Sequence, residues 1–186
     1  KAETDGEAAF RINAEAPAVI AGACKTIGAL RMHYSTDYVF DGKATRPYRE
    51  DDVTAPLGIY GASKLAGEQA IRDSGARHAI LRTAWVYAAH GRNFQLTMLR
   101  LAAERGELRV VADQFGAPTP AAWIADATAE LLRQGVAESG TWHLTLQGKA
   151  SWHGFAASIV DEAHALGLLQ RKPVVLPITT AEYPTP

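Results

Sequence analysis

Tyr60 and Lys64 are the residues of this chain whose types and spacing could do chemistry on a carbonyl group. They stand in Tyr60-Gly-Ala-Ser-Lys64, and the helix-forming run that follows them predicts that both lie on one face of a helix, at i and i+4. A phenol is a poor acid near neutral pH, but a neighbouring ammonium group stabilises the phenolate and lowers the pKa of the phenol. The pair therefore predicts a proton donor for the reduction of a ketone, although helices also carry this spacing by chance.

The segments around this pair alternate between strand and helix. Strands are expected over 30–34 and 78–86, on either side of the helix from Tyr60 to about Ser74, and this order indicates parallel strands joined by helices. An alanine-rich helix over 7–28 should kink or restart at Pro17, and residues 43–57 should form a polar loop. Further helices are expected over 93–105, 121–134 and 151–166, and further strands over 108–112, 141–146 and 173–178. The predicted fold class is α/β.

The composition of the chain excludes several classes of function. The 186 residues carry a formal net charge of −1 with no basic run, so neither nucleic acid nor an anionic membrane is an expected partner. No apolar run is long enough to span a bilayer and the first residues do not resemble a signal peptide, so a cytoplasmic protein is expected. Cys24, the single cysteine, is interpreted as a buried reduced thiol. The six histidines lack metal-ligand spacing, and no metal site is predicted.

One motif of dinucleotide-binding domains is missing from the sequence. Such domains usually open with a strand and a Gly-x-Gly-x-x-Gly turn, whose backbone approaches the pyrophosphate, and the sequence contains no such turn. The chain opens instead on a helix-rich stretch. Either the fold is of another kind, or the chain starts part-way through it.

Six segments can be read together as one pattern. They are His33-Tyr-Ser-Thr-Asp-Tyr-Val-Phe-Asp-Gly42, Pro47-Tyr48, Tyr60-Gly-Ala-Ser-Lys-Leu-Ala-Gly-Glu68, Arg82-Thr-Ala-Trp-Val-Tyr87, Asn93-Phe94 and Asp113-Gln-Phe-Gly-Ala-Pro-Thr119. In order and spacing they resemble the dTDP-4-dehydrorhamnose reductases of the extended short-chain dehydrogenase/reductase superfamily, and the closing Tyr183-Pro-Thr-Pro186 resembles the start of that family's Pro-rich segment.

The resemblance implies an incomplete Rossmann-type doubly wound parallel sheet with a smaller α/β substrate-binding domain. Residues 1–90 would form part of the NAD(P)-binding domain and residues 91–186 mainly the substrate-binding domain, with segments that can interleave. Because members of this family are longer at both ends, the 186 residues alone are expected to be inactive and to bind dinucleotide weakly.

The resemblance also implies a reaction. NADPH, with NADH as an alternative, would deliver hydride to C4 of a dTDP-linked 4-keto-6-deoxy sugar and so give dTDP-L-rhamnose. Tyr60 would be the acid, Lys64 would lower its pKa and bind the nicotinamide ribose, and Thr36 would donate its hydroxyl to the carbonyl oxygen or to Tyr60.

Each implied site residue has an ordinary structural alternative. Cofactor contacts are expected from Tyr60, Lys64, Thr83 and Ala84, and substrate contacts from Thr36, Asp37, Tyr38, Trp85, Asn93 and Gln114. Structural roles would make Thr36 a strand-end hydroxyl, Asp37 a turn cap, Asn93 a helix cap, Gln114 part of a plain turn, and the two aromatic residues core. Glu3 is expected near the site without an assigned role.

Two other functions stay open for this sequence. A nucleotide-sugar epimerase or dehydratase of the same superfamily would carry the same Tyr-x-x-x-Lys and retain NAD, which exchange of the cofactor during turnover would reveal. A regulatory subunit, of the kind that methionine adenosyltransferase has, would use the fold without reducing a sugar. Oligomeric state is left open, with a homodimer as one alternative.

Overall fold

The structure, a computed structural model, describes residues 2–183, and the predicted α/β class with parallel strands is confirmed there. The α-helices are α1 (Gly6–Phe10), α2 (Ala16–Ile27), α3 (Ile59–Ser74), α4 (Phe94–Glu104), α5 (Ala121–Gln134) and α6 (Trp152–Ala165). The strands are β1 (Arg31–Thr36), β2 (His78–Thr83), β3 (Val86–Tyr87), β4 (Glu107–Val111), β5 (Phe115–Gly116), β6 (Thr119–Pro120), β7 (Gly140–His143), β8 (Ala150–Ser151) and β9 (Val174–Ile178). The last three residues of the predicted Pro-rich segment lie outside the described part.

The chain divides into two compact units whose segments interleave. Unit 1 comprises the chain up to Thr83 together with Thr128–Leu144, and unit 2 comprises Ala84–Ala127 together with the chain from Thr145. The assignment of residues 1–90 to the cofactor and 91–186 mainly to the substrate stays a prediction.

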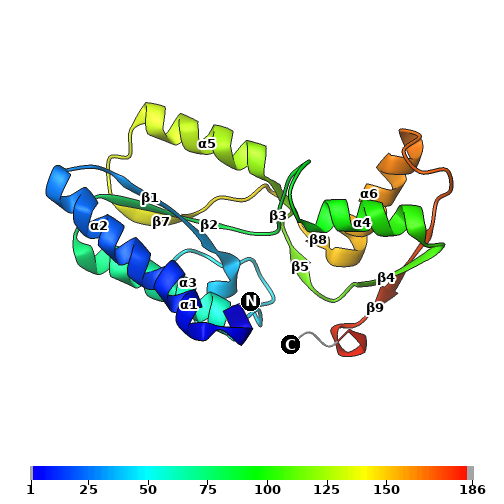
Figure 1. The fold of residues 1–186 in the computed structure, drawn as a ribbon, viewed down its shortest axis with the longest axis horizontal. Coiled ribbons are helices and arrows are strands. Elements are labelled where there is room, and N and C mark those ends of the chain that lie inside the picture. The colour runs from blue at the N-terminus through cyan, green and yellow to red at the C-terminus, as the bar shows by residue number, and fades with distance from the viewer. Residues whose placement is uncertain (1, 184–186) are drawn as a thin grey trace. The chain divides into compact units, whose positions relative to one another are not determined.

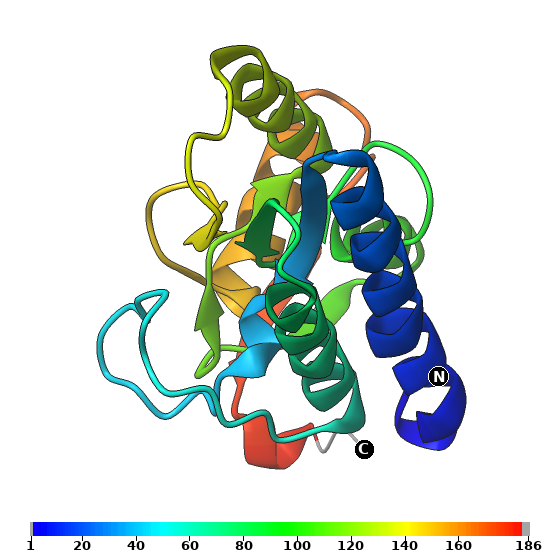
Figure 2. The same ribbon diagram turned by 90° about the vertical axis from the view of Figure 1, so that its left-hand side faces the viewer.

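Unit 1 is built on the parallel sheet β1-β2-β7. Helices α2 and α3 run side by side along one face of this sheet (Figures 1 and 2), and residues 128–134 of α5 lie on the other face. Side chains of a strand alternate between faces, so buried His33 points to the opposite face from Tyr34, whose hydroxyl lies 2.8 Å from Oγ1 of Thr128 on α5. The predicted order of parallel strands joined by helices is therefore present in this unit.

The first helical stretch changes its geometry before Pro17. The π-helical segment Arg11–Glu15 separates α1 from α2, and Pro17 stands in the first turn of α2, as a restart of the helix at this residue predicts. Proline has no N–H to donate back to Asn13, and its ring crowds that carbonyl, so the ladder shifts there. Gly28 ends α2 in the left-handed conformation, with a φ of 68°.

Unit 2 contains three short pairs of strands. Strands β4 and β9 pair in parallel, β3 and β6 do the same, and β5 pairs with β8 in antiparallel register. Helices α4 and α6 pack together over β4, and their apolar faces form the core of this unit. Neither the pair β3–β6 nor the pair β5–β8 was predicted from the sequence, because strands of two residues carry no periodicity.

No helix within residues 2–183 combines the length and the apolar character that a membrane span requires.

Candidate active site

Unit 1 brings two predicted site residues together at the carboxyl ends of neighbouring strands. Thr36 ends β1 and Thr83 ends β2, and the register of the two strands places them directly opposite each other. Thr83 is buried, and its hydroxyl donates to the backbone carbonyl of Ser35 at 3.4 Å. The carboxyl ends of parallel strands are the usual place for ligands in open α/β sheets.

Helix α3 carries Tyr60 and Lys64 close to this strand end. Tyr60 packs edge-on against the ring of Tyr38, with 5.8 Å between the ring centroids. The contact depends on Gly61, because a β-carbon at that position would lie 2.2 Å from the backbone oxygen of Tyr38. The glycine of Tyr-Gly-Ala-Ser-Lys thus lets the helix approach the turn that follows β1.

The hydroxyl of Thr36 joins the groups at this turn. It donates to Oδ1 of Asp37 at 3.1 Å and accepts the backbone N–H of Tyr38 at 3.2 Å, which caps the 3₁₀ turn Asp37–Val39. Burial raises the pKa of Asp37, and the hydrogen bond from Thr36 opposes that rise. Thr36 is thus the strand-end hydroxyl of the structural alternative, and it also supplies the cap of the turn that this alternative assigned to Asp37. Direct substrate contacts stay predictions.

The expected direction of the Tyr60 pKa is wrong for this structure. Burial raises the pKa of the Tyr60 phenol above its ordinary value, a side-chain hydrogen bond with Thr36 opposes the rise, and the charge of Asp37 adds to it. Burial likewise raises the pKa of Tyr38. Lys64 is not among the groups that shift the pKa of Tyr60, and desolvation of the phenolate is the largest cause of the rise.

Lys64 forms its hydrogen bond with the backbone of β1 and not with the side chain of Tyr60. Its Nζ donates to the backbone carbonyl of Tyr34 at 2.6 Å. Burial lowers the pKa of Lys64, and the nearby carboxylate of Glu68 partly restores it.

Glu68 forms a buried ion cluster that sequence reasoning missed. The carboxylate of Glu68 is fully buried and accepts hydrogen bonds from Nε and Nη2 of Arg82 at 2.9 and 2.8 Å. Arg72, one helical turn further along α3, donates to the same carboxylate at 2.7 Å. The one available signal was the i, i+4 series from Lys64 to Glu68 and Arg72 on a single helix face.

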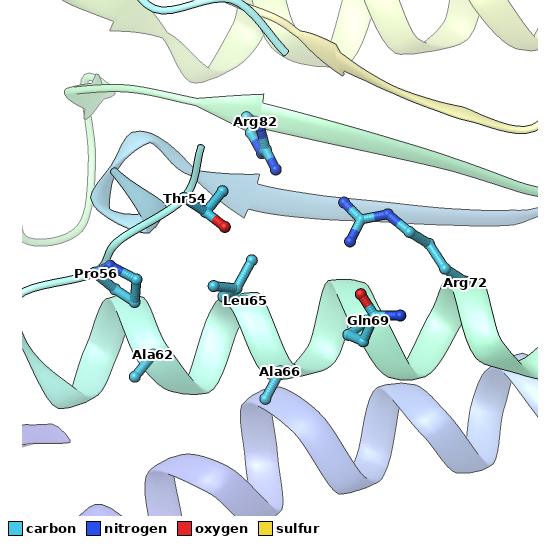
Figure 3. Close-up of a pocket in the computed structure, with 8 residues that line it drawn as sticks. All are labelled: Thr54, Pro56, Ala62, Leu65, Ala66, Gln69, Arg72 and Arg82. Atoms are coloured by element: carbon cyan, nitrogen blue, oxygen red, sulfur yellow. The ribbon is translucent and has the colours of Figure 1, made fainter. Parts of the chain in front are cut away.

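The two arginines also border a cavity of about 520 Å³ within unit 1 (Figure 3). Its lining consists of Thr54, Pro56, Ala62, Leu65, Ala66, Gln69, Arg72 and Arg82. In Figure 3 the two guanidinium groups approach this space from α3 and from β2. None of the predicted site residues lines it, so the cavity is separate from the Tyr60 cluster.

Glu3 acquires a defined contact. Its carboxylate accepts the backbone N–H groups of Ile59 and Tyr60, each at 3.0 Å, and these bonds lower the pKa of Glu3. Gly58, the N-cap residue of α3, supplies no side chain, and a β-carbon there would lie 2.8 Å from Oε1 of Glu3. Glu3 therefore caps the helix that carries Tyr60.

Unit 2 contains the remaining predicted site residues. Ala84 is buried beside Trp85, whose backbone has a φ of 47°. Asn93 caps α4 through the N–H of Leu96 at 3.1 Å, and its amide donates to two carbonyls of the preceding loop. Gln114 donates to Oγ1 of Thr180 at 3.1 Å. Asn93 and Gln114 thus have structural contacts, and their ligand contacts stay predictions.

Comparison with known proteins identifies what this chain is similar to. The sequence profile described as RmlD substrate binding domain matches residues 1–186. The chain is 50% identical over 194 residues to the dTDP-4-dehydrorhamnose reductase of Burkholderia thailandensis and 47% identical over 189 residues to that of Escherichia coli K12. All of the chain is covered in both cases, and it spans 65% and 63% of the length of these relatives.

Solved structures give the same result for the fold. A dTDP-4-dehydrorhamnose reductase from Bacillus anthracis in complex with NADP superposes with a TM-score of 0.91 and 39% identity, over 99% of this chain and 63% of that one. A dTDP-4-dehydrorhamnose reductase from Clostridium acetobutylicum superposes with a TM-score of 0.90 and 37% identity, over 100% of this chain and 63% of that one. The predicted Rossmann-like α/β fold is confirmed.

Proposed function

This chain belongs to the RmlD substrate binding domain family, and from that premise we propose that the whole protein carrying it is an NADPH-dependent oxidoreductase. Its reaction is reduction of the C4 ketone of dTDP-4-dehydrorhamnose to dTDP-L-rhamnose. The observation that carries this proposal is the cluster at the end of β1, where Thr36 stands opposite Thr83 and the helix with Tyr60 and Lys64 packs against the next turn.

Tyr60 is the proton donor in this reaction. Because burial raises its pKa, the phenol keeps its proton at neutral pH and can give it to the carbonyl oxygen as C4 becomes tetrahedral. Thr36 contributes its hydroxyl to the oxygen that gains charge or to the phenolate that remains. The Thr36 hydroxyl has one proton, so it must break its hydrogen bond to Asp37 before it can donate to either oxygen. The Tyr60 phenolate then recovers a proton from solvent.

The residues present fit a nicotinamide cofactor. NADPH, when bound, supplies the hydride. An ammonium group can donate three hydrogen bonds. Within residues 2–183 the one acceptor of Lys64 is the carbonyl of Tyr34, so two N–H groups remain for the ribose hydroxyls. Thr83 and Ala84, at the end of β2, would border the nicotinamide. NADH stays an alternative donor, and a cytoplasmic location is part of the proposal.

The test uses the full-length protein with the dTDP-linked ketosugar and NADPH. Tyr60→Phe should lower kcat by roughly 10²- to 10⁴-fold, the usual contribution of a positioned general acid, and leave the affinity for the sugar nucleotide largely unchanged. Tyr48→Phe is the matched control, because Tyr48 lies in the 43–57 loop and its hydroxyl donates to Asp41. Full activity of Tyr60→Phe would remove Tyr60 as the acid, and a wild-type protein that consumes no NADPH would remove the proposed function.

A further inference from the structure

Trp85 has an unusual backbone for its size. Within residues 2–183 it is the one non-glycine residue with a positive φ, 47°, and its carbonyl accepts the N–H of Thr119 at 3.2 Å. A bulky side chain in this region is strained and persists only where its surroundings hold it. Such outliers cluster at functional sites, so the contacts of the Trp85 ring are informative.

Trp152 covers one face of the Trp85 indole. The two rings stack with 3.4 Å between centroids and 7° between planes. Trp152 is itself supported by Phe94 of α4, whose ring centroid lies 4.6 Å away. The stack is thus anchored in the core of unit 2.

Gly116 covers the other face. A β-carbon on Gly116 would lie 2.4 Å from Cε2, 2.6 Å from Nε1 and 2.9 Å from Cδ2 of Trp85, which is an approach over the pyrrole ring. If this β-carbon lay between the two rings, which stack 3.4 Å apart, it would be as close to Trp152 as to Trp85. Its three nearest atoms all belong to Trp85, so it does not lie between them. Gly116 therefore lies against the face that Trp152 leaves open.

The local fold brings together Trp152 and Gly116, which form a clamp around the indole of Trp85. Gly116 of β5 pairs with Ala150 of β8, and Ser151 caps α6 by accepting the N–H of Gly154 at 3.0 Å. Trp152 is the first residue of that helix. Trp152 thus covers one face of the half-buried Trp85 indole and Gly116 covers the pyrrole ring on the other, which leaves the edge that carries the N–H.

We propose that Trp152 and Gly116 are positioning residues that hold Trp85 edge-on, so that its indole N–H donates to an oxygen of the sugar in the bound nucleotide. This rests on the proposed function. Within the described residues the Trp85 N–H has no protein acceptor, which leaves it available to a hydroxyl or carbonyl oxygen. A donor fixed at one edge distinguishes sugars by the position of an oxygen, whereas a stacked face would accept any ring of similar shape.

The decisive variants are Trp85→Phe and Trp85→Ala in the full-length protein. Phenylalanine keeps an aromatic face and removes the N–H, so both variants should raise the KM for the sugar nucleotide by roughly tenfold, the value of one net hydrogen bond. The Kd of dTDP, which has no sugar ring beyond its deoxyribose, should stay unchanged in both. A Trp85→Phe protein with the wild-type KM would overturn the proposal, because it would show that the face and not the edge is used.

The positioning role is tested by Trp152→Leu, Trp152→Phe and Gly116→Ala. Trp152→Leu and Gly116→Ala should raise the same KM, and Trp152→Phe should recover most of the loss because it restores an aromatic support. Near-ultraviolet circular dichroism reads the stack without any substrate: its tryptophan bands should change in Trp152→Leu and not in Trp123→Phe, a control on α5. If the tryptophan bands change but no variant alters the KM, the positioning role of Trp152 and Gly116 is refuted. If the wild-type protein does not reduce the sugar nucleotide, the proposed function fails, while circular dichroism still tests the clamp around Trp85.

Discussion

The carboxylate of Glu3 accepts the backbone N–H of Tyr60 at 3.0 Å, although the two residues are 57 positions apart in the sequence. The same carboxylate accepts the N–H of Ile59, so one side chain satisfies two of the four free donors at the start of α3. A negative charge at this end also complements the helix dipole. The start of the helix that carries the proposed acid is thus fixed by Glu3, which precedes the first helical stretch of the chain.

Glu3→Ala should loosen the first turn of α3. The amides of Ile59 and Tyr60 lose their acceptor, so they should exchange with solvent faster and kcat of the full-length protein should fall several-fold. Glu7→Ala is the control, because Glu7 forms an exposed pair with Arg11. Amide hydrogen exchange and steady-state kinetics measure the two effects; unchanged exchange at Tyr60 would contradict the capping role.

Gly61→Ala should separate Tyr60 from the end of β1. The new β-carbon would stand 2.2 Å from the backbone oxygen of Tyr38, so the helix or the turn must move and activity should fall strongly. Gly22→Ala on α2 is the matched control: nothing lies within 4 Å of its β-carbon, and alanine in a helix should stabilise by about 0.5–1 kcal/mol. Thermal unfolding and kcat of both variants decide the matter, and a fully active Gly61→Ala protein would show that the close contact is dispensable.

Glu68→Gln should destabilise unit 1. The substitution leaves Arg82, whose side chain is 3% exposed, without its counter-ion, and breaking a buried pair in this way costs about 3–5 kcal/mol. Glu104→Gln, which breaks the exposed pair with Arg100, should cost less than about 1 kcal/mol. Denaturant unfolding measures both values. Equal losses in the two variants would mean that the buried cluster has no special weight.

His33 should make stability depend on pH. Its pKa is lowered from 6.5 to about 4, first by burial and then by the charges of Lys64 and Arg31. The unfolded chain therefore takes up a proton at higher pH than the folded chain does. The stabilising contribution is complete above about pH 6.5 and is lost as the pH falls towards 4, on the order of 3 kcal/mol in all.

His33→Gln should flatten the decline in the free energy of unfolding between these pH values, and the exposed His90→Gln should not. Denaturant titrations at both ends of the range provide the comparison. A His33→Gln protein with the wild-type pH dependence would assign the acid sensitivity to other groups.

Prediction from the sequence succeeded where a pattern is local. The Tyr60 helix was expected to end near Ser74 before Gly75, and α3 does end there, because helical periodicity and a glycine stop act over a few residues. It failed for the pKa of Tyr60, which burial by distant segments determines. The two-residue strands around Gly116 were missed because such pairs leave no periodic signal.

The sequence by itself determined the α/β class, the placement of Tyr60 and Lys64 on one helix face, and the resemblance from which the family followed, since these depend on residue types and short spacings. Tertiary structure alone decided which distant groups meet: Glu3 with the start of α3, Arg82 with Glu68, and Gly116 with Trp85. The physical reason is that such contacts arise from strand register and close packing between elements, which bring together residues that no spacing along the chain relates.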